Sequence, residues 1–183
     1  ETDSVLIGTG NPAPWNAHTR PGDNLYSASS LAIDPSTGKI KWHYQTTPND
    51  GWDFDGVNEL VSFDLKKDGK TIKAVGKADR NGFFYVLDRT NGKLISATPF
   101  VTKQTWATGV DLKTGRPVEI KGARYEDGEE LVWPSVFGAH GRRKRKGGRV
   151  LIAPTPQGGV STGGLASDRP GSRRVDERTA NYV

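Results

Sequence analysis

Cysteine is absent from the sequence, which excludes disulfide bonds and thiolate metal sites within the chain. Apolar runs are short as well, and none approaches the roughly 18 residues that a membrane-spanning helix needs. Glu1 does not begin a basic region, an apolar region and a cleavage site, so we expect any export signal to lie outside this chain. Only 33% of the 183 residues are hydrophobic, whereas Gly and Pro number 23 and 11, which favours a turn-rich β protein over a helical bundle.

Positive charge is concentrated in one segment. The net charge of +5 would suit a nucleic-acid-binding protein, but residues 1–140 carry 16 basic against 18 acidic side chains, a net of −2. Residues 141–183 carry 10 against 3, a net of +7, and are rich in Gly, Ser, Thr, Pro and Arg, so we expect this tail to be disordered. Its run RRKRK has no interleaved aromatic residues for base stacking, which disfavours nucleic-acid binding.

The first 140 residues alternate short apolar stretches with turn signals. The stretches are rich in β-branched and aromatic residues, and the Gly, Asn, Asp and Pro clusters between them are too short for crossover helices. We therefore predict an all-β domain over residues 1–140. The predicted strands lie at residues 4–10, 29–34, 39–46, 60–65, 71–78, 82–88 and 93–101.

One turn sequence recurs three times, beginning at Asp34, Asp88 and Asp111. Each copy reads Asp-x-x-(Thr/Asn)-Gly-(Lys/Arg), which predicts a hairpin whose aspartate accepts hydrogen bonds from the following amides and whose glycine is left-handed at a bulge. The first two copies lie 54 residues apart, a spacing that fits one four-stranded propeller blade with a loop. A β-sandwich uses similar turns, so the repeat alone leaves both architectures open. Three blades are too few to close a propeller ring.

Two short motifs suggest other functions but lack the context that those functions need. Residues 5–13 combine a strand with the pattern Gly-x-Gly-x-x-Ala of dinucleotide-binding proteins, yet prolines follow where a helix has to begin. Residues 159–163 fit the Gly-x-Ser-x-Gly pattern of serine hydrolases, but no helix pattern follows and no partner residues can be placed. The three histidines lack metal-ligand spacing. We interpret none of these features as a site.

The stretch DGWDFDG, residues 50–56, carries a more informative pattern. In an extended segment alternate side chains share a face, so Asp53 and Asp55 are predicted to point one way and Trp52 and Phe54 the other. Two carboxylates a few ångströms apart repel each other, and a hard, oxygen-seeking cation between them relieves that repulsion. An ordinary solvated turn is the alternative, and the residues alone leave it open.

Longer motifs resemble those of a known enzyme family. The stretch GTGNPAPWNAHTRPGDNLYSASSLAIDPSTGKIKWHYQTTPNDGWDFDGVNELVSFD, followed by ADRNGFFYVLDRTNGK, is similar to the quinoprotein alcohol dehydrogenases that use pyrroloquinoline quinone (PQQ), such as methanol and ethanol dehydrogenases. The resemblance runs from about Val5 to His140, through FVTKQTWATGVDLKTGRPVE and WPSVFGAH. It implies about two to three blades of an eight-bladed β-propeller, locked by tryptophan-docking repeats. LAIDPSTGKIKW is a good copy of that repeat, and YVLDRTNGKL is a poorer copy without the tryptophan.

The resemblance also assigns roles to individual residues. It implies that Asn11 and Asp53 are metal ligands, and that Asp53 is the general base that removes the alcohol proton. It implies that Arg80 contacts the quinone oxygens. These roles agree with elementary chemistry, because a metal ion polarises the quinone carbonyl, Arg80 offsets developing negative charge and Asp53 accepts a proton.

Asp55 indicates which metal the parent enzyme uses. By the resemblance, calcium-type members carry a small uncharged residue two positions after the catalytic aspartate, whereas lanthanide-type members carry an aspartate there as an extra ligand. A trivalent ion of calcium's size favours the added negative charge. We therefore predict PQQ and a lanthanide ion as cofactors, with calcium as the alternative, and Asn11, Asp53 and Asp55 as the metal ligands.

The resemblance ends where the basic tail begins. The family continues beyond residue 140 with another strand-rich blade, whereas this chain continues as GRRKRKGG. The family's N-terminal half, which supplies a glutamate metal ligand, a vicinal disulfide and a tryptophan beneath the cofactor, has no counterpart here, and neither do the later blades. We expect residues 141–183 to come from a truncated or frameshifted gene rather than from selection for a basic tail.

The sequence thus predicts a fragment of a periplasmic PQQ-dependent dehydrogenase that oxidises primary alcohols to aldehydes and is inactive alone. The parent enzyme is expected to use small alcohols and a cytochrome c-type electron acceptor. The alternatives are a non-catalytic partial propeller that binds or scaffolds other proteins, and a nucleic-acid-binding protein that acts through RRKRK. Asn11, Asp53 and Arg80 together favour the enzyme, because a scaffold needs none of them. An isolated propeller arc exposes two strand edges, so we also expect aggregation or marginal folding.

Overall fold

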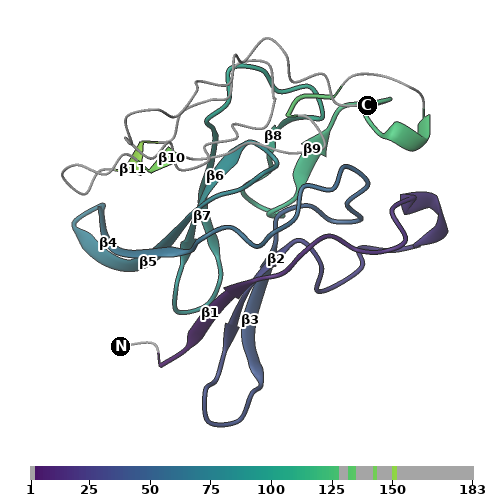
Figure 1. Cartoon of the computed structure of the whole chain (residues 1–183). Coiled ribbons are helices and arrows are strands. Elements are labelled where there is room, and N and C mark those ends of the chain that lie inside the picture. Colours follow the sequence, from purple (N-terminus) through teal and green to yellow (C-terminus); the bar gives the residue numbers. More distant parts are fainter. Residues whose placement is uncertain (1–2, 128–131, 135–141, 144–149, 152–183) are drawn as a thin grey trace, which may run out of the picture.

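The computed structural model describes residues 3–127, 132–134, 142–143 and 150–151 (Figure 1). Within these residues the only helices are the 3-10 turns η1 (Ala17–Thr19) and η2 (Tyr125–Asp127), and neither is long or apolar enough to cross a membrane. All other regular structure is β. The strands are β1 (Val5–Gly8), β2 (Ser29–Ile33), β3 (Ile40–Gln45), β4 (Val61–Lys67), β5 (Lys70–Ala78), β6 (Phe83–Asp88), β7 (Leu94–Pro99), β8 (Ala107–Val110), β9 (Pro117–Glu119), β10 (Arg142–Arg143) and β11 (Val150–Leu151).

Neighbouring strands pair into antiparallel sheets in the order β1–β2–β3, β4–β5–β6–β7 and β8–β9, and β10 pairs with β11. Figure 1 shows the first sheet at the bottom, the second at the left and centre, and β8–β9 at the upper right. Each of the seven stretches predicted to be a strand coincides with one, although β4 extends two residues beyond its predicted end and β5 begins one residue before its predicted start. β6 illustrates why, because its residues alternate between buried and partly exposed and so give the sheet one core-facing side.

The core lies where the inner faces of these sheets meet. Phe83, Tyr85 and Leu87 of β6 are each about 1% exposed, and they belong to one cluster with Trp52 and Trp106, which are fully buried. The Trp106 ring centroid lies 5.0 Å from that of Trp52. Large aromatic side chains from three separate segments therefore make up much of the core.

The three repeated turns have the predicted geometry. In the first, Asp34 Oδ1 accepts hydrogen bonds from the amides of Ser36 and Thr37, at 2.8 and 3.1 Å. The register shifts next to the turn, as a bulge requires, and the glycines of all three turns have φ between 69° and 75°. Asp88 and Asp111 likewise accept a bond from the amide two residues on, each at 2.8 Å.

Side chains from β3 join successive sheets through these turns. Trp42 Nε1 donates a hydrogen bond to the carbonyl of Arg89 at 3.0 Å, and the Trp42 ring lies so close to Gly92 that a Cβ there would be 2.6 Å from Cε3. Tyr44 reaches the third turn, where its hydroxyl donates to the carbonyl of Gly115 at 2.8 Å. Sheets joined side by side through such contacts are adjacent blades of a β-propeller, which is the predicted fold rather than the sandwich.

The boundary predicted at residue 140 stays a prediction, because residues 135–141 lie outside the described residues. In the tail the structure describes only the paired strands β10 and β11. The rest of the tail that was predicted to be disordered lies outside the described residues, and so does the Gly-x-Ser-x-Gly motif at residues 159–163.

Candidate functional site

Residues 50–56 form a loop between β3 and β4, so the prediction that they are extended is wrong. Asp53 and Asp55 adopt left-handed backbone conformations, with φ of 60° and 54°. The predicted separation of faces is confirmed, because Trp52 and Phe54 are fully buried whereas the two aspartates are partly exposed. A chain that alternates left-handed residues with ordinary ones curls so that its amides line a concave side. The loop therefore places its aromatic and its acidic side chains on opposite sides without being a strand.

The two aromatic residues anchor this loop in the core. The rings of Trp52 and Phe54 stack at 5.7 Å with their planes 20° apart. Trp52 Nε1 donates to the carbonyl of Ala123 at 2.7 Å, and the Arg124 guanidinium lies 4.8 Å from the centre of the Trp52 ring. The acidic side chains are thus carried on a segment whose other side is fixed by packing.

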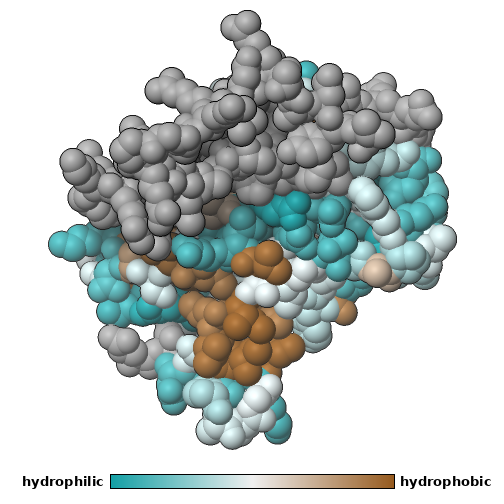
Figure 2. Space-filling model, viewed as in Figure 1, coloured by the Kyte–Doolittle hydropathy of each residue, from teal (hydrophilic) through white to brown (hydrophobic). Residues whose placement is uncertain are grey.

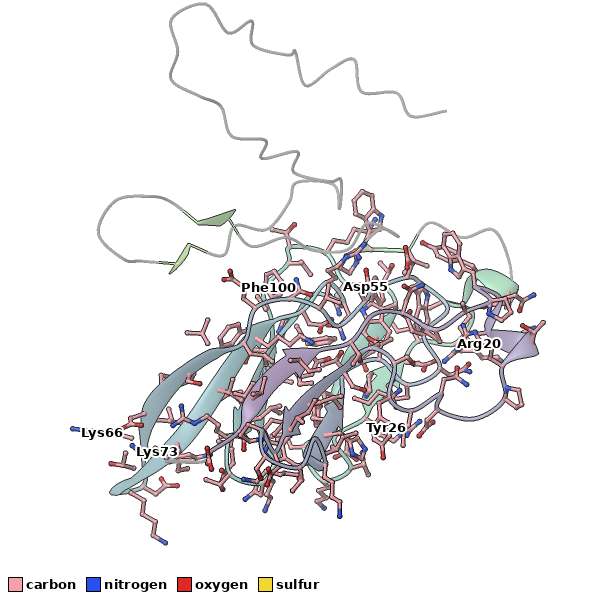
Figure 3. All side chains as sticks on the ribbon, turned by 60° about the horizontal axis from the view of Figure 1, so that its bottom comes forward. Arg20, Tyr26, Asp55, Lys66, Lys73 and Phe100 are labelled. Atoms are coloured by element: carbon pink, nitrogen blue, oxygen red, sulfur yellow. The ribbon has the colours of Figure 1, made fainter. Side chains whose placement is uncertain are left out.

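The structure brings the four predicted site residues together from three segments. The backbone amide of Asn11, which follows β1, donates to Asp55 Oδ1 at 2.8 Å. Arg80, in the turn between β5 and β6, makes an ion pair with Asp55 Oδ2 through Nη1. Asp53 interacts electrostatically with both Asp55 and Arg80. Figure 3 shows Asp55 well away from Lys66 and Lys73 of the β4–β5 hairpin, so the cluster lies at the other end of that sheet.

A close approach of two backbones makes this convergence possible. A Cβ at Gly8, the last residue of β1, would lie 1.9 Å from the carbonyl oxygen of Gly56. Only glycine allows the end of β1 to pack directly on the end of the loop. Gly8 also belongs to the Gly-x-Gly-x-x-Ala pattern of dinucleotide-binding proteins. The helix that such a motif needs is absent at this point, because η1 has only three residues, and Gly8 instead packs against the end of the acidic loop.

Burial and neighbouring charges shift the pKa of Asp53. The pKa of Asp53 is raised above its ordinary value, first by burial and then by the neighbouring charge of Asp55, while Arg80 acts in the opposite direction. The side chains of Arg80 and Asp55 are only 16% and 20% exposed, so their ion pair is shielded from solvent. A carboxylate with a raised pKa is a better proton acceptor at neutral pH than an ordinary aspartate.

Three further side chains, none of them predicted as site residues, hold the backbone of the loop through buried contacts. Asp50 and Lys77 are each about 1% exposed. Lys77 Nζ donates to the carbonyl of Gly56 at 2.6 Å and pairs with the buried Asp79 at 2.9 Å. Arg20 Nη2 donates to the carbonyl of Asp50 at 2.7 Å. The sequence gives no strong signal for these roles, because an isolated Lys or Asp in a strand or loop normally faces solvent.

A pocket of about 500 Å³ adjoins the loop at Gly51 and is lined also by Trp15, Asn16, Tyr125 and Glu126. Trp15 Nε1 donates to the carbonyl of Gly51 at 2.9 Å, which ties one wall of the pocket to the loop that carries Asp53. Its aromatic walls suit the apolar part of a small organic molecule.

The donor chemistry of the cluster suits a hard cation. Asn11, Asp53 and Asp55 offer amide and carboxylate oxygens, the ligands that calcium and similar ions prefer. Among the residues that the structure describes, no group of three His, Cys, Asp or Glu side chains is placed to hold a metal. The candidate ligands are therefore the two carboxylates and the side-chain amide of Asn11, whose contact with Asp55 is made by its backbone N–H. Six to eight oxygen ligands are usual for such ions, so other ligands have to come from outside this cluster. His43 instead packs its ring against Tyr26 at 4.8 Å.

Comparison with protein families connects this geometry to an enzyme class. Residues 1–114 match the PQQ family described as glucose/ethanol/alcohol dehydrogenase, β-propeller domain. Over 138 residues the chain is 64% identical to the quinoprotein alcohol dehydrogenase PedH of Pseudomonas putida, covering 75% of this chain and 23% of that protein. It is 58% identical over 133 residues to a quinoprotein ethanol dehydrogenase of Pseudomonas aeruginosa, covering 68% of this chain and 21% of the relative.

Solved structures give the same relationship. A europium-containing methanol dehydrogenase is 43% identical, with a TM-score of 0.70, over 75% of this chain and 24% of its own. The quinohemoprotein alcohol dehydrogenase of Comamonas testosteroni is 48% identical, also with a TM-score of 0.70, over 76% of this chain and 21% of its own. The chain therefore spans about a fifth to a quarter of the length of the relatives that it matches.

Proposed function

The chain belongs to the β-propeller family of PQQ-dependent glucose, ethanol and alcohol dehydrogenases, and from this we propose that it supplies part of the active site of an alcohol dehydrogenase. The convergence of Asn11, Asp53, Asp55 and Arg80 carries the proposal. Two partly buried carboxylates, one amide and one guanidinium from three segments supply part of what metal-assisted alcohol oxidation requires. A partial propeller that only binds other proteins needs none of these contacts.

In the proposed reaction each of these residues has a separate task. When bound, PQQ and its metal ion supply the electrophilic carbonyl that accepts hydride from the alcohol carbon. Asp53 takes the proton from the alcohol hydroxyl oxygen, a role that its raised pKa favours. Arg80 holds positive charge beside the site, where negative charge develops on oxygen. The pocket beside Gly51 takes the hydrocarbon part of a primary alcohol.

We propose a lanthanide as the metal, held by Asn11, Asp53 and Asp55, with calcium as the alternative. Two carboxylates favour a trivalent over a divalent ion on charge alone. The chain contributes only part of the ligand set, so we further propose that it is inactive alone. The whole enzyme would work in the periplasm, with a small primary alcohol as substrate and a cytochrome c-type protein as electron acceptor.

The experiment that tests this function is a graft. Residues 5–134 replace the matching stretch of the Pseudomonas putida relative, and alcohol oxidation is measured with PQQ plus either a lanthanide or calcium. We expect activity with the lanthanide and its loss in Asp53→Asn. Asp55→Ala should weaken lanthanide affinity at least about tenfold, because it removes a charged ligand. Asp64→Ala, an exposed aspartate of β4 paired with Lys73, is the matched control.

Two results would count against the proposal. Unchanged lanthanide dependence in Asp55→Ala would exclude the selection of the metal by that residue. Full activity of Asp53→Asn would exclude the proposed base and, with it, the assignment of the site.

A further inference from the structure

Asp50 is a buried carboxylate for which the proposed chemistry has no use. Its Oδ1 accepts a hydrogen bond from the amide of Trp52 at 2.8 Å, and its Oδ2 accepts one from the amide of Phe54 at 2.9 Å. Burying an ionisable group costs free energy even when it is hydrogen-bonded, and burial raises the pKa of this carboxyl to about 6. Both oxygens face the backbone of the loop, so Asp50 is not itself available as a ligand.

The two bonds enclose Asp53. The amides of Trp52 and Phe54 are held by one carboxylate, and Asp53 lies between them with φ of 60°. Asp55 follows with φ of 54°. The left-handed conformation is strained for a residue with a Cβ, so two such residues separated only by Phe54 need an external constraint. Asp50 supplies it, because the loop curls around this carboxylate with its amides turned inward.

We propose that Asp50 is a positioning residue that sets the separation and orientation of Asp53 and Asp55. This inference rests on the proposed function in so far as those two aspartates form the metal and proton site. Asp50 acts through the backbone, while Trp52 and Phe54 fix the opposite side of the loop in the core. Without Asp50 the two carboxylates would relax to conformations in which they no longer face the same point.

Asp34 provides a matched control for a merely local role. Its carboxylate also accepts bonds from the amides two and three residues on, at 2.8 and 3.1 Å, but it shapes an exposed hairpin turn. Asp34→Asn and Asp50→Asn remove the same kind of interaction from two different loops. Only Asp50→Asn is expected to change the separation and orientation of the Asp53 and Asp55 carboxylates.

The test measures the coupling between Asp53 and Asp55 without any metal. In the 183-residue chain with labelled aspartate carboxyl carbons, Asp55→Asn should shift the NMR signal of Asp53 at pH 7, because the two carboxylates are neighbours. In a chain that already carries Asp50→Asn, the Asp55→Asn substitution should shift the Asp53 signal much less. In an Asp34→Asn chain the full shift should persist. A full shift in the Asp50→Asn chain overturns the proposal.

A second measurement covers the case in which Asp50→Asn unfolds the isolated chain. The variant is then made in the graft, and the affinity for terbium alone is expected to fall about 10- to 100-fold, as for loss of other residues that orient metal ligands. Unchanged terbium affinity in a folded graft overturns the proposal. If the unmodified chain shows the coupling but the unmodified graft binds no terbium, the proposed metal site fails and the positioning role of Asp50 stands.

Discussion

At the scale of single residues, the ion pair between Arg80 and Asp55 creates a competition. A cation held by Asp53 and Asp55 has to share Asp55 with the guanidinium. We therefore expect Arg80→Gln to raise the affinity of the chain for terbium by about three- to tenfold, because it removes a nearby positive charge. In the graft the same variant should lose activity, because charge stabilisation at the quinone is lost.

The control for this prediction is Arg116→Gln. Arg116 also pairs with an aspartate, Asp23, at 2.7 Å, but both side chains are about half exposed and lie on another part of the surface. It should leave terbium affinity unchanged. If Arg80→Gln weakens terbium binding, Arg80 supports the metal site instead of competing with it.

The buried Asp50 carboxyl should make the free energy of unfolding of the chain depend on pH. Its pKa of about 6 in the folded chain lies above the 3.8 of an ordinary aspartate, so the folded state binds the proton more tightly than the unfolded state. This contribution to stability is present in full below about pH 4 and is lost as pH rises through 6. Between pH 4 and 7 it amounts to about 3 kcal/mol. Denaturant unfolding of the chain and of Asp50→Asn should show that difference between their pH profiles, and parallel profiles would exclude it.

The resemblance to the dehydrogenase family assigned Asn11, Asp53, Asp55 and Arg80 to one site, because the motifs that carry it are long and specific. Residue patterns could not reveal the way in which they meet. The left-handed conformations of Asp53 and Asp55 depend on Asp50, whose burial follows from the packing of Trp52 and Phe54. The separation of the side chains into two faces was predictable, but the curled backbone that produces it was not.

At the scale of elements, the junction between blades can be tested with two glycines from equivalent turns. Gly38 and Gly92 have φ of 69° and 75°, but only at Gly92 would a Cβ collide, 2.6 Å from Cε3 of Trp42. Both alanine variants incur backbone strain of about 1 kcal/mol. Gly92→Ala should cost about 1–3 kcal/mol more, because Trp42 has to move. Denaturant unfolding of the two variants compares them directly, and equal losses would mean that the Trp42 contact does not support the fold.

The strands and turns were predictable because their signals are local. β6 alternates in burial along its length, and the turn at Asp34 makes the bonds that its sequence specifies. Contacts between sheets are not local in this sense. Tyr44, for example, donates to a carbonyl 71 residues away, and nothing in its own segment indicates that partner.

At the scale of the whole molecule, the arc leaves surfaces that a longer propeller would cover. The first sheet has three strands where the second has four, and β1 forms one of its edges. Val5 and Ile7 of β1 are 49% and 39% exposed. Figure 2 shows apolar residues gathered over the region of β1, β2 and β3. A flat apolar edge without charge or proline is a template for pairing with another chain.

We therefore expect the 183-residue chain to self-associate through β1. Sedimentation velocity should show species that grow with protein concentration. Ile7→Lys should suppress association, because a charge on an edge strand opposes pairing. Thr71→Lys adds the same charge to an exposed position of β5, opposite Lys66 of β4 in the second sheet, and should not suppress it. A chain that stays monomeric at every concentration would mean that the edge of β1 needs no cover from a further blade.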